Sequence, residues 1–288
     1  LILLGLLSAA ILIYVELRVA NPVLALRLFK ERMVSVGLVL TLLTGFAMFG
    51  AIIFVPLYFQ GVLGASATSS GTFLTPMMLG VVAGASISGQ VLSRTGGHFR
   101  IQGLLGIGVM ALGVFLFSNL GSDSAYGMAV TFIIILGFGL GSTFPTLTLA
   151  VQNFTPPDAI GAATSLTQFA RTIGGLIGLS ALGSVLSMRF EDKLEKGIMG
   201  LEMDVPPLAL EELKNNPRAL IDSESQSSIL DSAAEEIGSD SFNIVVEVLK
   251  GSLSGAITDV FNVALVILLV SIVVCFFLNK TGFRKRNG

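Results

Sequence analysis

Residues 33–59 read MVSVGLVLTLLTGFAMFGAIIFVPLYF, a stretch without a single Lys, Arg, Asp or Glu. A helix needs about 20 apolar residues to cross the hydrocarbon core of a bilayer, because its backbone N–H and C=O groups must be satisfied within the segment. Five more stretches meet this test: 71–92, 101–119, 128–151, 161–188 and 258–278. The sequence therefore predicts an all-α integral membrane protein with six complete spans.

The composition supports a lipid environment. Mean hydropathy is +0.85 and 53% of the residues are hydrophobic, whereas only 12% are charged. A soluble domain has about 25% charged residues. All but one of the 17 basic and 19 acidic residues fall in the joints between the apolar stretches or at their edges. The exception is Arg171.

The apolar stretches and joints divide the chain into six segments. Residues 1–15 are apolar but rise only about 22 Å as a helix, too little to span the membrane. The chain also begins without Met or a charged flank, so we expect a fragment whose first segment is the end of a truncated transmembrane helix. The expected order is this end at 1–15, a cytoplasmic joint at 16–32, five spans within 33–188, an external acidic loop at 189–257, the last span at 258–279 and a basic cytoplasmic tail at 280–288.

Basic residues predict the orientation. Joints 60–70 and 120–127 contain no Lys or Arg and should face outward, by the positive-inside rule. The 189–257 segment holds fourteen of the nineteen acidic residues, but loops of this length translocate largely regardless of charge. Its apolar residues recur at helical spacing in 229–237 and 242–249, which predicts amphipathic helices. The basic residues gather in the alternate joints and the tail: Arg18, Arg27, Lys30, Arg32, Arg94, Arg100, Lys280, Arg284, Lys285 and Arg286.

Two features concern internal organisation. The pair Gly45 and Phe46 resembles Gly137 and Phe138 in a span of opposite direction. Such a pattern is typical of the inverted repeats of secondary transporters, although chance matches are common among glycine-rich apolar stretches. The intramembrane glycines predict close helix packing, since a phosphate-binding loop would need a preceding strand.

The joint between 71–92 and 101–119 reads GQVLSRTGGHFR. It resembles the cytoplasmic loop motif of the major facilitator superfamily, G-x-L-x-D-R-x-G-x-R/K, through Gly89, Arg94, Gly96 and Arg100. Ser93 stands where the N-terminal copy of that motif has Asp, as in the degenerate copy of the C-terminal half.

Three further stretches carry the same resemblance: ELRVANPVLALRLFK at 16–30, PPDAIGAATSL at 156–166 and RTIGGLIG at 171–178. Together they are similar to the 14-helix drug:proton antiporter branch of the superfamily. The resemblance implies that the six spans are the C-terminal six-helix bundle. It also implies a missing N-terminal bundle of the same protein as partner, a small-molecule substrate and no cofactor.

Arg171 is the charge that lies well inside a span. An intramembrane charge indicates a functional or paired role facing the bundle interior, and the alternative is that its long side chain snorkels to the headgroups. Gln168 lies one turn earlier on the same face. The family fold places soft, adaptable side chains beside the central cavity, although core packing or lipid contact is the alternative for each. These cavity candidates are Phe46, Met48, Phe49, Met77, Met78 and Phe144.

The sequence lacks several signals. No Asp or Glu lies well within a span, so the coupling proton is expected in the N-terminal half. The single Cys, Cys275, leaves no disulfide within the chain, and no metal spacing, nucleophile motif or nucleic-acid partner is indicated, so we expect no enzyme.

The hypothesis is the C-terminal half of a proton-coupled multidrug exporter in the plasma or inner membrane, moving amphipathic or cationic compounds outward by alternating access. The alternatives are a carrier of another solute and a membrane-embedded assembly or interaction subunit, and the isolated chain is expected to be inactive.

Overall fold

The computed structural model describes residues 26–65, 67–121, 124–199 and 239–278, together with Leu7, Ile11, Tyr14 and Val15. These residues form helices and short turns, and none of them lies in a strand. Most of the expected truncated helix, the first part of the 16–32 joint, the predicted amphipathic segment at 229–237 and the basic tail lie outside the described residues.

Within this part of the chain, six helices are long and apolar enough to cross a membrane, which confirms the predicted all-α membrane fold. Short 3₁₀ helices, η1 (Leu26–Lys30) and η2 (Pro157–Ala159), precede α2 and α6. The six long helices are α2 (Arg32–Gly61), α3 (Ala67–Arg94), α4 (Phe99–Ser118), α5 (Tyr126–Asn153), α6 (Ile160–Met199) and α9 (Ser239–Cys275).

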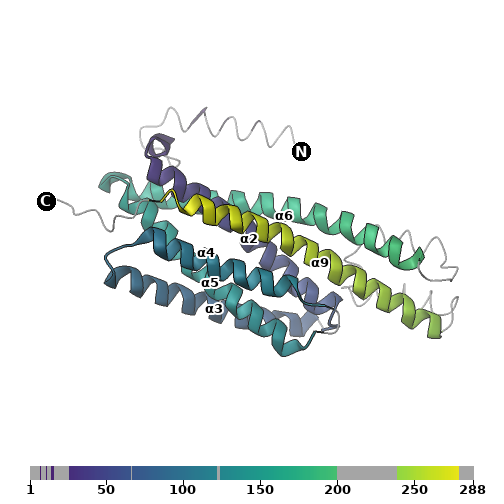
Figure 1. Ribbon diagram of the computed structural model, residues 1–288. Helices are drawn as coiled ribbons and strands as arrows, with labels where there is room; N and C mark the ends of the chain where they lie inside the picture. Colours follow the sequence, from purple (N-terminus) through teal and green to yellow (C-terminus); the bar gives the residue numbers. More distant parts are fainter. Residues whose placement is uncertain are drawn as a thin grey trace.

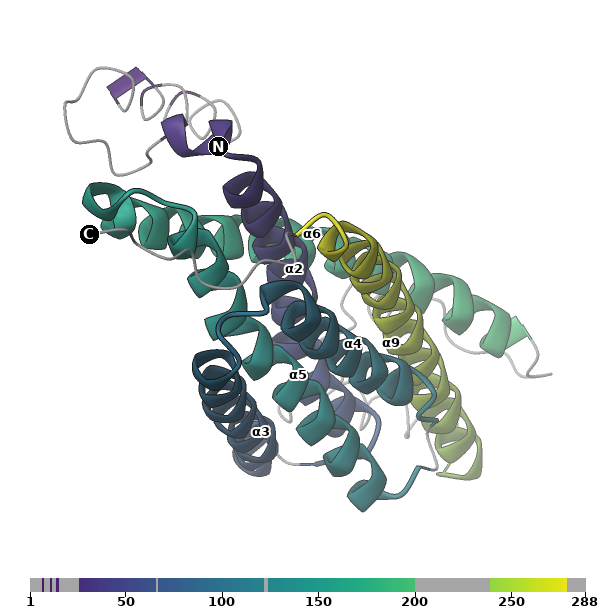
Figure 2. The ribbon, with the colours of Figure 1, turned by 60° about the vertical axis from the view of Figure 1, so that its left-hand side comes forward.

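The six long helices pack in two groups of three, and the two groups contact each other. Helix α5 lies against both α3 and α4, and α2 lies against both α6 and α9 (Figure 1). The groups join where α2 meets α5 and where α4 meets α9, whereas α3 and α4 barely touch (Figure 2). In the first group only α5 holds the other two helices together, whereas α2, α6 and α9 all contact one another.

Glycines create the closest approaches between helices, because each lacks a side chain where the neighbouring backbone passes. Three contacts join α2 to α6: Gly45 to Arg171, Leu42 to Gly174 and Phe46 to Gly178. Three contacts join α5 to α3: Gly137 to Met77, Ile134 to Gly80 and Phe138 to Gly84.

The two sets of contacts are copies of one another. Each residue of α2 corresponds to the residue of α5 that lies 92 positions later, and each residue of α6 corresponds to the residue of α3 that lies 94 positions earlier. The α2–α3–α4 unit and the α5–α6–α9 unit therefore form an inverted repeat, the arrangement that the Gly-Phe pairs indicate.

Helices α6 and α9 extend further than the sequence alone indicates. They have 40 and 37 residues, which correspond to about 60 and 55 Å, well beyond a hydrocarbon core of about 30 Å. Their ends project together past the other helices on the side of the α2–α3 and α4–α5 connections (Figure 1). The charged residues after position 188 thus continue α6, and α9 begins at Ser239, within the segment that the sequence assigned to a loop.

Packing and ion pairs explain this continuation. The side chains of Phe190 and Leu194 in α6 and Leu253 in α9 are fully buried in the core shared by the two helices. A carboxylate oxygen of Asp259 in α9 lies 3.7 Å from the Nε of Arg189 and 3.3 Å from the Nζ of Lys193. The two extended helices thus bury apolar side chains between them and carry ion pairs at the edge of this contact. Both features stabilise a helix pair outside lipid.

Candidate functional site

Arg171 lies where α6 meets both α2 and α5. Its backbone carbonyl packs against Gly45 of α2, and its side chain reaches toward α5. There its Cζ lies 4.4 Å from the centroid of the Phe144 ring. Its Nη1 donates a hydrogen bond of 3.0 Å to Oε1 of Gln168. Three of the residues singled out from the sequence, Phe144, Gln168 and Arg171, thus form one group, which we call the Arg171 cluster.

The Arg171 cluster holds a positive charge that forms no ion pair with a carboxylate of the described residues. The guanidinium is half-buried, while Gln168 is exposed. A ring face and an amide oxygen partly replace the water that a guanidinium would otherwise have. The cluster therefore presents a fixed cation beside an aromatic ring at the exposed edge of the bundle.

The other cavity candidates lie in different surroundings. The Phe49 ring packs on Gly175, one turn beyond Arg171 on α6, so Phe49 borders the cluster from α2. Phe46 and Met48 are buried in the core. Met77 is fully buried between α3 and α5, at the repeat position that corresponds to Arg171, and its neighbour Met78 is exposed. The six apolar candidates thus do not share one surface.

The loop motif forms the turn from α3 to α4. Gly96 has a φ of 74° and the following glycine, Gly97, one of 86°, left-handed values that strain other residues. Arg94 ends α3 and is exposed, whereas the Arg100 guanidinium carbon lies 5.0 Å from the centroid of the Phe276 ring. Gly89 has open space where a side chain would stand.

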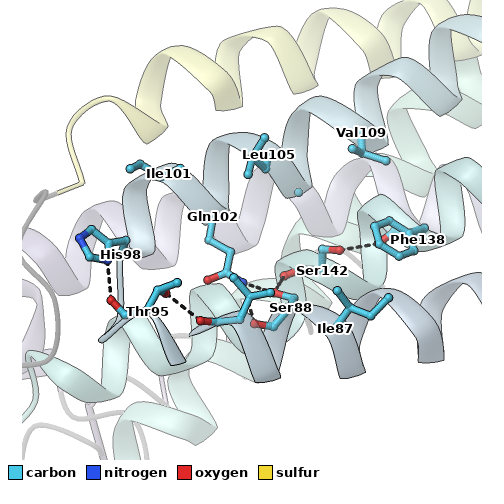
Figure 3. Close-up of a pocket in the computed structure, with 12 residues that line it drawn as sticks. Ile87, Ser88, Thr95, His98, Ile101, Gln102, Leu105, Val109, Phe138 and Ser142 are labelled. Carbon is cyan, nitrogen blue, oxygen red and sulfur yellow. Dashed lines mark hydrogen bonds between the residues drawn. The ribbon is translucent and has the colours of Figure 1, made fainter. Parts of the chain in front are cut away.

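Sequence reasoning missed a cavity of about 430 Å³ beside this turn, between α3, α4 and α5 (Figure 3). Its polar floor consists of Ser88, Gln102 and Ser142. Nε2 of Gln102 donates to the Ser88 carbonyl at 2.6 Å, and the Ser88 hydroxyl donates to the Ser142 carbonyl at 2.9 Å. In the sequence, the signal for this cavity was an amide, Gln102, near the start of one span, together with Ser88 and Ser142 within two neighbouring spans. Its apolar wall consists of Ile87, Val91, Ile101, Leu105, Val109 and Phe138.

Comparison with known families agrees with this architecture. The family model described as Major Facilitator Superfamily matches residues 1–179. The chain belongs to the major facilitator superfamily.

Several curated members of this superfamily are similar to the chain. The multidrug transporter protein MdtP of Bacillus subtilis is 33% identical over 292 residues, which cover 99% of this chain and 53% of the relative. Multidrug resistance protein 3 of the same organism is 30% identical, over 92% of this chain and 49% of the relative. The tetracenomycin C resistance and export protein of Streptomyces glaucescens is 33% identical, over 66% of this chain and 36% of the relative.

The chain therefore spans about half the length of the two Bacillus subtilis relatives. The six long apolar helices of its described residues and its membership of the superfamily identify it as a multi-pass membrane protein. Named relatives in this group are transporters rather than enzymes. A bilayer accompanies such a fold.

Proposed function

We propose that this chain supplies the C-terminal half of a proton-coupled multidrug exporter. Amphipathic or cationic compounds would leave the cell by alternating access, as this bundle rocks against an N-terminal bundle of the same protein. The bundle lies in the plasma or inner membrane with its C-terminus in the cytoplasm, as the basic joints indicate.

The observation that carries this proposal is the inverted repeat with the Arg171 cluster at its edge. The repeated glycine contacts hold α2 against α6 and α3 against α5 as rigid pairs, which suits a bundle that moves as one body. The cluster adds a cation and an aromatic ring to an exposed face. The names of the Bacillus subtilis relatives, which refer to multidrug transport and resistance, support a drug as the cargo.

Arg171 has a positioning role in this proposal, and it does not carry the coupling proton. A guanidinium stays protonated in proteins, so it cannot exchange a proton during a transport cycle. Asp259 lies where the extension of α9 meets the last apolar span, and there it is paired with Arg189 and Lys193. We therefore assign the coupling proton to the N-terminal bundle.

The test is efflux of a fluorescent cationic dye from energised cells or vesicles that contain the complete transporter, with and without a protonophore. Efflux should collapse with the proton gradient. Arg171→Ala should reduce the initial rate by about tenfold or more at equal expression, because the cluster loses its charge. Thr172→Ala, an exposed change one residue away on α6, should leave the rate unchanged.

Two results would contradict the proposal. Efflux that persists without the gradient would remove proton coupling. A broad dye panel in which nothing moves would favour a carrier of another solute class.

A further inference from the structure

A groove between α3 and α4 has no role in the proposed transport path. Helices α3 and α4 diverge from their shared turn while both pack on α5, so the space between them has α5 as its floor. We call this space, the 430 Å³ cavity of Figure 3, the α3–α4 groove. Its volume lies within the range of about 300–1,000 Å³ that is typical of ligand pockets.

The groove is lined for an apolar occupant. Its rim residues Ile87, Val91, Ile101 and Leu105 are exposed on the membrane-spanning parts of α3 and α4, so the groove opens on an apolar surface of the described bundle. The polar donors of its floor are paired: Nε2 of Gln102 and the hydroxyls of Ser88 and Ser142 donate to backbone carbonyls, and the Ser88 hydroxyl also lies 3.0 Å from the Thr146 hydroxyl. An apolar chain can therefore cover these donors without leaving them unpaired.

A cationic residue lies next to the turn end of the groove. Between residues 33 and 122, the only charged side chains are Arg94 and Arg100. Arg100 is directed toward α9, where it stacks on Phe276. Arg94 is exposed next to Thr95, which lines the groove, and it forms no ion pair with any residue that the structure describes. The imidazole of His98 lies at the same end, with its Nδ1 2.7 Å from the Thr95 carbonyl oxygen.

We propose that the α3–α4 groove binds an anionic phospholipid, with one acyl chain between α3 and α4 and the phosphate headgroup beside Arg94 and His98. The apolar wall matches the chain, and the cation at the turn end matches the headgroup. Basic sites at the ends of membrane helices select anionic lipids in this way. The proposed site concerns the membrane rather than the cargo.

Tryptophan quenching by brominated lipids tests this site directly, because the chain contains no Trp. Leu105→Trp, at a wall position that is 64% exposed, places a reporter in the groove. Val273→Trp in α9, at a position 61% exposed, is the matched control. Gly103 on α4 lies beside Cys275 on α9, so these two residues are at the same depth. Leu105 and Val273 each lie two residues further from the turn end of the bundle, so the two reporters are matched in depth. Any Trp outside this chain is replaced by Phe.

The purified protein is reconstituted in vesicles that contain brominated phosphatidylglycerol or brominated phosphatidylcholine at equal mole fraction. At Leu105→Trp, the anionic lipid should be preferred by about fivefold, the size expected for one cationic side chain near an anionic lipid. At Val273→Trp, which lies one turn from the Phe276 ring that Arg100 covers, Arg94→Gln should leave the preference unchanged. Adding Arg94→Gln should reduce the preference at Leu105→Trp toward one. Adding Lys30→Gln, which removes a charge at the same end of the bundle, should leave it unchanged.

A preference at Leu105→Trp that Arg94→Gln does not lower, or that it lowers equally at both reporters, would overturn the proposal. So would a Leu105→Trp reporter that neither lipid quenches, because protein rather than lipid would then cover the groove. If Leu105→Trp does not fold, Ile101→Trp at the same wall gives the same comparison. Lipid preference is measured without transport, so this result and the efflux result are independent.

Discussion

Arg171 combines two functions in one residue. Its backbone packs on Gly45 and so belongs to the contact between α2 and α6, while its side chain crosses to Phe144 on α5. Substitution of the side chain removes the second function and leaves the first intact. Met77 holds the corresponding backbone position in the other half of the repeat, with an apolar side chain that is fully buried. The two halves of the repeat therefore differ at this position, with a half-buried cation in one and a buried apolar side chain in the other.

The contact with Phe144 leads to a first prediction. Phe144→Leu removes the ring but keeps an apolar side chain, and a partly buried cation–π contact contributes about 1–2 kcal/mol. We expect dye efflux to fall several-fold while the protein amount in the membrane stays unchanged. Phe144→Tyr keeps a ring face and should retain most of the rate. If Phe144→Leu and Phe144→Tyr have equal rates, the ring does not position Arg171.

Arg171→Lys separates charge from shape. Lysine keeps the positive charge but lacks the planar guanidinium that stacks on Phe144 and bonds to Gln168. We predict an efflux rate between those of the wild type and Arg171→Ala. A rate as low as that of Arg171→Ala would show that stacking geometry, rather than charge, is what the cluster supplies.

At the scale of elements, glycine positions determine which helices pair. A Cβ on Gly84 in α3 would collide with the backbone of Phe138 in α5, which cannot move aside without shifting the helix. Gly89 lies five residues later on the same helix and has nothing within 4 Å of a Cβ. The two glycines thus form a matched pair for a test of close packing.

We predict that Gly84→Ala lowers the free energy of unfolding by about 1–3 kcal/mol, the usual effect of overpacking. Gly89→Ala should be neutral or raise it by up to about 1 kcal/mol, because alanine favours a helix more than glycine does. Unfolding in a denaturing detergent series would measure both. Equal changes for the two variants would show that the α3–α5 contact does not depend on the glycine.

The repeat extends this prediction to α6. Gly178 contacts the backbone of Phe46 as Gly84 contacts that of Phe138. Gly178→Ala should therefore destabilise the protein by a similar amount, and Gly183→Ala, at a position with open space, should not. A small effect of Gly178→Ala beside a large effect of Gly84→Ala would mean that the two halves of the repeat are not equally tight.

At the scale of the whole molecule, connections alternate between two ends of the bundle. The α3–α4 turn and the α5–α6 joint lie at one end, and the α2–α3 and α4–α5 connections lie at the other (Figure 1). The basic residues Arg94 and Arg100 belong to the first end. Orientation in the membrane then depends on which end stays in the cytoplasm.

Cysteine accessibility tests the orientation. Cys275 is buried, and Cys275→Ser gives a clean background for new thiols. In intact cells, a membrane-impermeant maleimide should label Ala125→Cys at the α4–α5 connection, and it should label Thr95→Cys only after permeabilisation. Both positions are exposed. The reverse pattern would contradict the charge-based orientation.

The six spans and the family follow from the sequence by itself. Whether a stretch such as 33–59 crosses a membrane depends on its own length and apolar composition, which are local properties. The loop motif around Arg94 and Gly96 is likewise a run of neighbouring residues. The Gly45-Phe46 and Gly137-Phe138 pairs even indicated the repeat, because both copies of the motif lie within single helices.

Only the tertiary structure determined which residues meet. The contact between Arg171 and Phe144 joins two helices, and the groove beside Gln102 exists because α3 and α4 separate over α5. The length of α6 could not be predicted from the sequence either, because the charged residues near Phe190 stay helical through packing on α9. These features depend on side chains distant in sequence. Hydropathy and spacing describe one segment at a time, so they cannot determine how segments pair.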